Sequence, residues 1–140
     1  MDAKRKISAV VFSDLGQAAS FMKLDWVQRA LEKSLGFAPF PATLNVRPTT
    51  AEDLKVWQSV CRDEKGIPLL PSDGGFCAAR LFSVALHELR SDRDASIKGA
   101  VLLPEVANYP KDKIEIVAAV RLKDDFGVRD GDQLTLEFVP

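Results

Sequence analysis

The sequence predicts a mainly β fold, namely a small α+β barrel with one principal covering helix. About six short segments rich in β-branched and aliphatic residues are typical of strands. One longer segment, Asp25–Leu35, has the apolar spacing of an amphipathic helix. One main helix with several short strands favours a closed sheet covered by that helix. At 140 residues the chain has the size of one domain and can bury a core.

The first strand and the principal helix are the clearest elements of the N-terminal half. Residues 6–13 contain three β-branched residues and are expected to form a strand. The helix carries apolar residues at positions i, i+4 and i+8, which are Val27, Leu31 and Leu35. We expect Asp25 to cap this helix and Gly36 to end it.

The middle of the chain is expected to hold a strand, a short helix and a long loop. Residues 43–46 are expected to form the second strand. The run Thr49-Thr50-Ala51-Glu52 has the form of a capping box, which predicts a short helix ending near Trp57. Residues 62–75 are rich in proline, glycine and charge, and are expected to form a surface loop.

The remainder of the chain is expected to be built from strands. Four apolar segments are expected to form them: residues 76–86, 97–103, 114–120 and 133–139. A short helical turn is expected at Asp124–Phe126. The run Asp130-Gly131-Asp132 is expected to be a turn that feeds the last strand.

Composition narrows the class of protein. Hydrophobic residues make up 46% and charged residues 28%, which is ordinary for a globular protein. The net charge of −1 disfavours a non-specific nucleic-acid binder, since such a protein needs a basic surface. No apolar run approaches the ~20 residues that span a bilayer, and no signal-peptide cleavage pattern follows the basic N-terminus. Cys61 and Cys77 lie outside any CxxC spacing and are expected to be free thiols in a reducing cytosol. We therefore expect a cytoplasmic protein with no membrane partner.

Thr43 and Asn45 form a candidate metal site. Their i, i+2 spacing places both side chains on one face of an extended strand. A hydroxyl and an amide carbonyl are hard oxygen donors that suit Mg²⁺, which also binds nucleotide phosphates. The alternative is a strand whose two polar side chains face solvent.

The segment that contains these residues resembles a known family. Gly36-Phe37-Ala38-Pro39-Phe40-Pro41-Ala42-Thr43-Leu44-Asn45 is similar to the signature of the CTP-dependent riboflavin kinases best known from archaea. Four further segments are similar to this family in order and spacing: Leu15-Gly16 with Phe21-Met22, Lys98–Pro104, Ile114–Ala118, and Leu122-Lys123 with Asp130–Asp132. The resemblance implies a cradle-loop barrel, and it implies that residues 1–140 form a single riboflavin-kinase-like domain.

The resemblance also implies an activity and a set of site residues. The activity is transfer of a phosphoryl group to riboflavin to give FMN, with Mg²⁺ and with CTP or another nucleoside triphosphate as donor. Thr43 and Asn45 would bind the metal, and Glu115 would act on the flavin's ribityl hydroxyl. The nucleotide would contact the loop residues Leu15, Gly16 and Gln17 and the pyrimidine-side segment Val120, Arg121, Leu122 and Lys123. The flavin would contact Ala107 or its neighbour Asn108.

Glu115 lies in an alternating segment between Ile114 and Ile116, so its side chain points away from theirs. A carboxylate at that position can orient or deprotonate a hydroxyl. The alternative is an ordinary exposed glutamate on an amphipathic strand.

The chain departs from the family pattern at four positions. Ala42 replaces a glycine, which matters only if the backbone there has a positive φ. The glycine-rich phosphate loop keeps only Gly16, and Asp14 adds a negative charge where phosphates would lie. Ala107 stands for a threonine, and Lys123 stands for an arginine and so loses the bidentate fork.

Two further hypotheses remain beside the kinase. The eroded glycine loop favours a flavin- or nucleotide-binding module that has lost catalysis. The Gly-Asp-hydrophobic pattern at residues 131–134 is similar to that of swapped-hairpin DNA-binding barrels, which suggests a nucleic-acid-binding barrel. The sequence leaves open the phosphate donor and the oligomeric state.

Overall fold

The computed structural model describes residues 5–13, 22–63, 66–69, 78–88 and 96–139. The strands are β1 (Arg5–Phe12), β2 (Leu44–Pro48), β3 (Ile67–Leu69), β4 (Ala79–Glu88), β5 (Ser96–Pro104), β6 (Ile114–Ala118) and β7 (Gln133–Phe138). The helices are α2 (Asp25–Leu35), α3 (Ala51–Asp63) and α4 (Leu122–Phe126). None of the described helices is long and apolar enough to cross a membrane.

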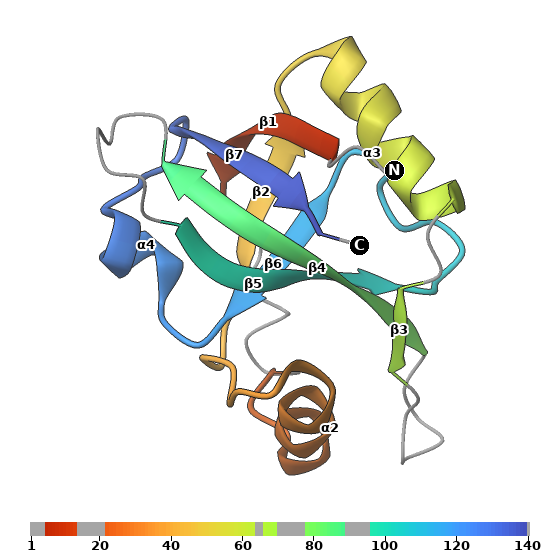
Figure 1. The fold of residues 1–140 in the computed structure, drawn as a ribbon, viewed down its shortest axis with the longest axis vertical. Helices are drawn as coiled ribbons and strands as arrows, with labels where there is room; N and C mark the ends of the chain where they lie inside the picture. The colour runs from red at the N-terminus through yellow and green to blue at the C-terminus, as the bar shows by residue number, and fades with distance from the viewer. Residues whose placement is uncertain (1–4, 14–21, 64–65, 70–77, 89–95, 140) are drawn as a thin grey trace.

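Six of these strands close into an antiparallel barrel (Figure 1). The hydrogen-bonded order is β4-β5-β6-β2-β1-β7, and β7 pairs back with β4 to complete the ring. The short strand β3 is not part of this ring and pairs antiparallel with residues 79–81 of β4. This topology confirms the predicted mainly β fold, a small barrel with helices packed on it.

The barrel interior is filled by alternate residues of every strand. On β6 the inward side chains include Ile114 and Ile116, and on β7 they include Leu134 and Leu136, all with no exposed surface. Because side chains alternate along a strand, the residues between them face outward. This alternation determines which polar residues can form a site on the outer surface of the barrel.

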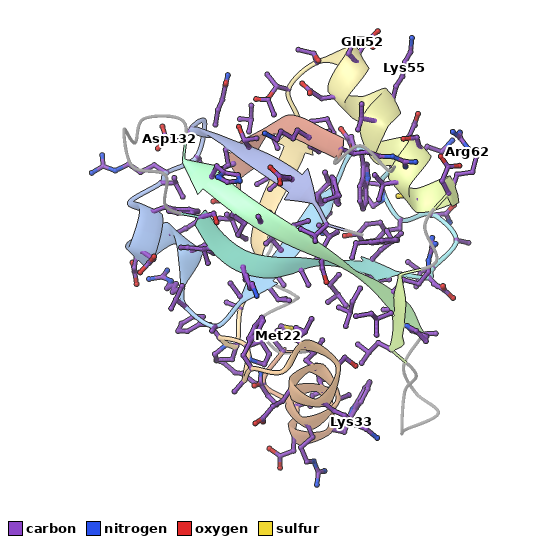
Figure 2. All side chains as sticks on the ribbon, in the orientation of Figure 1. Met22, Lys33, Glu52, Lys55, Arg62 and Asp132 are labelled. Atoms are coloured by element: carbon purple, nitrogen blue, oxygen red, sulfur yellow. The ribbon has the colours of Figure 1, made fainter. Side chains whose placement is uncertain are left out.

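Helix α2 covers part of that outer surface and matches its predicted bounds. Val27 and Leu31 are fully buried in a second apolar cluster with outward residues of the sheet, including Leu102 and Val117. Figure 2 labels Met22, a buried member of the same cluster, beside this helix. Gly36 ends the helix with φ 81°, and its N–H donates to the Glu32 carbonyl at 2.9 Å.

The predicted cap of α2 is wrong. The N-cap position is Leu24, and no side chain donates or accepts a cap hydrogen bond there. Asp25 is instead the first helical residue, where its negative charge favours the positive end of the helix dipole. Aspartate is common both at the N-cap and at the first helical position, so the sequence alone did not distinguish these two positions.

Helix α3 is longer than predicted, so two main helices rather than one cover the barrel. It continues to Asp63 because apolar spacing persists beyond Trp57 to the buried Val60. The cap pair is Thr50 and Asp53 rather than Thr49 and Glu52. The Thr50 hydroxyl accepts from the Asp53 N–H at 3.1 Å and donates to its carboxylate at 2.8 Å.

Helix α3 packs against the barrel through Trp57, on the side opposite α2 (Figure 1). The indole stacks on Phe138 at a centroid distance of 5.7 Å and meets the edge of Phe82 at 5.9 Å. The predicted surface loop over residues 62–75 contains the end of α3 and strand β3. Residues 70–77 lie outside the described part of the chain.

Gly99 allows β5 and β6 to approach closely. A Cβ atom there would lie 2.7 Å from the Val117 carbonyl oxygen and 3.3 Å from a methyl of Leu86. We expect Gly99→Ala to lower the free energy of unfolding by about 1–3 kcal/mol, as overpacking does. Thermal or urea unfolding measures this, with the exposed Lys98→Ala of the same strand as control. An unchanged midpoint would show that the strands can separate at no cost.

Candidate active site

Asn45 of β2 and Glu115 of β6 face each other directly across the sheet. They are paired in the antiparallel register, between the inward pairs Leu44–Ile116 and Val46–Ile114. Both side chains therefore lie on the outer face of the barrel, with Cβ atoms about 5 Å apart as in any such pair. The register thus brings the predicted metal ligand and the predicted catalytic carboxylate side by side.

The same row of the sheet continues beyond this pair. Phe12 of β1 is the partner of Asn45 on one side, and Leu102 of β5 is the partner of Glu115 on the other. Leu102 belongs to the apolar cluster under α2. The polar pair thus lies between an aromatic ring and an apolar surface covered by a helix.

Glu115 is the only buried charged side chain among the described residues, with 6% of its surface exposed. Its Oε2 accepts a hydrogen bond of 2.6 Å from the hydroxyl of Tyr109. A buried carboxylate needs such a donor, because an unpaired buried charge is costly. The alternative of an ordinary solvent-exposed glutamate is therefore wrong.

Asn45 carries a buried side-chain oxygen, Oδ1, with no hydrogen-bond partner among the described residues. Buried polar atoms in native proteins nearly always have one, so this oxygen has room to bind a water or an ion. Thr43 lies two residues earlier, half-buried, with the buried Leu44 between them. No described residue other than glycine has a positive φ, so Ala42 fits this backbone without strain.

A cavity of about 120 Å³ brings Thr43 together with the predicted pyrimidine-side segment. Its lining includes Phe40, Thr43 and all four residues of that segment, Val120, Arg121, Leu122 and Lys123. The Phe40 N–H donates to the Ala118 carbonyl at 2.7 Å and so fixes the segment before β2 against the end of β6. Two stretches far apart in sequence thus form one pocket.

The cations of this pocket are tied to nearby carboxylates. Arg121 pairs with Asp124 at 3.3 Å, and Lys123 pairs with Asp130 at 3.6 Å. All four side chains are partly exposed, so these ion pairs contribute little stability. Both cations therefore remain within reach of an anionic ligand.

The run 130–132 forms the predicted turn, and it fixes the end of β1. Gly131 has φ 92° and donates its N–H to the Val11 carbonyl at 2.8 Å, while the Val11 N–H donates to the Asp132 carbonyl at 2.8 Å. The hydroxyl of Ser13 donates to Asp130 at 2.6 Å. The turn therefore sets where the chain leaves the barrel beside Phe12.

Of the other expected site residues that the structure describes, Asn45, Glu115, Ala107 and Asn108 do not line this pocket. Ala107 and Asn108 are exposed in a tight turn between β5 and β6, where the Tyr109 N–H bonds the Val106 carbonyl at 3.4 Å. Leu15, Gly16 and Gln17, with Asp14, lie outside the described residues.

Two further residues beside the pair were not singled out from the sequence. Tyr109, which holds Glu115, lies six residues earlier in an irregular loop, where no periodicity marks it. Arg47 lies two residues after Asn45, and its guanidinium carbon is 4.2 Å from the ring centroid of Phe12. Extending the i, i+2 spacing of Thr43 and Asn45 by one step would have found Arg47.

The other chemical groups in the described structure point elsewhere. Burial raises the pKa of the Cys61 thiol to about 11, against the opposing effect of Arg80, so this free cysteine is a poor nucleophile. It lines a separate cavity of about 410 Å³ between α3 and the 105–111 loop. No group of three or more His, Cys, Asp or Glu side chains in the described ranges could hold a metal ion.

Comparison with known proteins identifies the family. The sequence profile of the CTP-dependent riboflavin kinase family, described as a domain of unknown function (DUF120), matches residues 11–138. This match covers nearly all of the chain. The chain therefore belongs to this family.

Several archaeal riboflavin kinases are similar to the chain. The riboflavin kinase of Pyrobaculum calidifontis is 36% identical over 137 residues, which cover 96% of this chain and 60% of that protein. That of Archaeoglobus fulgidus is 28% identical and is covered to 54% of its length. That of Methanobrevibacter smithii is 30% identical over 133 residues, which cover 95% of this chain and 99% of that protein. The chain thus spans just over half of several relatives and almost the whole of another.

Proposed function

We propose that the protein is a riboflavin kinase, which transfers the γ-phosphoryl group of a nucleoside triphosphate, CTP by expectation, to riboflavin to give FMN. The observation that carries this proposal is the unpartnered buried oxygen of Asn45 opposite the buried carboxylate of Glu115. Family membership and the names of the relatives support the same activity.

The donor side of the reaction would lie at Thr43 and the 120–123 segment. Phosphoryl transfer depends mainly on positioning and on neutralising phosphate charge. Thr43 and Asn45 would hold Mg²⁺, which supplies that neutralisation when bound, and the lone Asn45 oxygen fits such an ion. The phosphates would also contact the backbone at Leu15, Gly16 and Gln17.

The nucleotide base would lie against residues 120–123. The cavity there is about 120 Å³, and a one-ring pyrimidine needs less space than a purine. Arg121 and Lys123 at its rim are partly exposed and can attract the triphosphate. The small cavity fits a pyrimidine such as that of CTP, whereas the two cations would attract the triphosphate of either nucleotide.

The acceptor side would be organised by Glu115. Its carboxylate would accept the proton of the terminal ribityl hydroxyl as that oxygen forms a bond to the γ-phosphorus. The bond between the γ-phosphorus and the bridging oxygen breaks at the same time, and the nucleoside diphosphate leaves. Ala107 and Asn108, on the loop beside Tyr109, would contact the flavin.

Incubation of the protein with riboflavin, MgCl₂ and either CTP or ATP tests this function. We expect FMN, separated by chromatography, to form with CTP and more slowly with ATP. Omission of Mg²⁺ is expected to abolish the product. A protein that quenches riboflavin fluorescence on binding but makes no FMN with any nucleotide would instead be the degenerate binding module.

The nucleic-acid hypothesis has its own test. A DNA-binding barrel would bind duplex DNA with an affinity that falls steeply as salt rises. The net charge of −1 argues against this outcome. Binding of DNA at moderate salt, without FMN formation, would replace the kinase proposal.

A further inference from the structure

Among the residues that the structure describes, Tyr109 is the only one whose side chain hydrogen-bonds to Glu115. Its hydroxyl donates to Oε2 at 2.6 Å, a usual length for a hydrogen bond from a hydroxyl to a carboxylate. The bond is partly buried, so water competes weakly for either group. Tyr109 is also the only tyrosine in the sequence.

The loop between β5 and β6 holds this ring in place. Two tight turns flank it, closed by the Tyr109 N–H to the Val106 carbonyl at 3.4 Å and by the Lys113 N–H to the Pro110 carbonyl at 3.3 Å. Pro110 also restricts Tyr109 to an extended backbone. The ammonium of Lys113 lies 5.6 Å from the centre of the ring, within the range of a cation–π contact.

We propose that Tyr109 is the positioning residue of Glu115, an inference that rests on the proposed kinase function. A carboxylate has two oxygens and can rotate about its last bond. With Oε2 held by Tyr109, Oε1 remains available to the ribityl hydroxyl on the row shared with Asn45. The exposed turn at Ala107 and Asn108 would then act through its neighbour Tyr109 as well as on the flavin.

This arrangement makes a specific kinetic prediction. Tyr109→Phe keeps the ring and its contact with Lys113 and removes only the donor. We expect kcat to fall about tenfold, because small errors in the placement of a base are costly, while KM for riboflavin stays nearly unchanged. In a Glu115→Gln background the same change should cause no further loss, since the two residues act as a unit. Asp112→Asn, which removes an exposed carboxylate of the same loop, is the matched control and should leave kcat unchanged.

A second measurement does not need activity. Protein labelled with ¹³C at tyrosine Cζ gives a single resonance, because Tyr109 is the only tyrosine. This resonance should move in Glu115→Gln and stay in place in Asp112→Asn. If the chemical shift of this resonance is the same in Glu115→Gln and in the wild type, the inference is wrong, whether or not the protein makes FMN.

The outcomes separate this inference from the proposed function. Wild-type protein that forms no FMN overturns the kinase proposal and the catalytic part of this inference together. Wild-type protein that forms FMN while Tyr109→Phe keeps its full kcat overturns the positioning role alone. The positioning role is also wrong if Tyr109→Phe lowers kcat by the same factor in the wild-type and in the Glu115→Gln background. That result would show that Tyr109 does not act through Glu115.

Discussion

Replacement of Glu115 by glutamine is expected to lower FMN formation by ~10²–10⁴-fold, the usual contribution of a positioned general base. Glutamine has the shape of glutamate but cannot take the hydroxyl proton. The Tyr109 hydroxyl can still donate to the amide oxygen, so the side chain should stay in place. The loss should therefore fall on kcat, with riboflavin binding retained.

Three measurements check this result. Steady-state kinetics gives kcat and KM, fluorescence quenching gives riboflavin affinity, and thermal unfolding gives stability. Glu52→Gln on the solvent side of α3, which Figure 2 labels away from the barrel, is the matched control and should behave as wild type. An unchanged rate in Glu115→Gln would remove Glu115 from the chemistry and leave its burial as a structural feature.

The sequence predicted the elements whose signals are local. The spacing of Val27, Leu31 and Leu35 and the glycine at position 36 located α2 and its C-terminal end, although the cap is Leu24 rather than Asp25. The end of α3 was missed because the capping box marks a beginning, whereas the end depends on burial of Val60 in the barrel core. The short strand β3 was missed because three residues form a strand only beside the partner strand β4.

The site required information that spacing does not carry. The alternation of side chains showed that Asn45 and Glu115 each face away from their apolar neighbours. Alternation within one strand does not determine which residue of another strand lies opposite. The register that joins them comes from the whole closed barrel. The bond from Tyr109 arises in an irregular loop, where side-chain direction follows from turns and a proline rather than from a repeat.

Asn45 offers the sharpest test because its effects on activity and stability should have opposite signs. Its buried Oδ1 has no partner in the described part of the chain, and an unpaired buried polar atom costs ~1–3 kcal/mol. Asn45→Leu removes that atom and keeps a side chain of similar size between Phe12 and Glu115. We expect the thermal midpoint to stay level or rise, while FMN formation falls about 100-fold through loss of a metal-binding oxygen.

The comparison with Asn45→Asp identifies the role of the oxygen. Aspartate keeps an oxygen donor at the same place but sets a second negative charge beside Glu115, so it should keep part of the activity, require Mg²⁺ and lower stability. Thr135→Val, a polar-to-apolar change on β7 away from the pair, should leave both activity and Mg²⁺ dependence unchanged. If Asn45→Leu is instead less stable and fully active, the lone oxygen has an unseen structural partner, and the metal site at Thr43 and Asn45 is wrong. If it is more stable and inactive, the structure keeps an unsatisfied atom at a cost in stability because the reaction needs it.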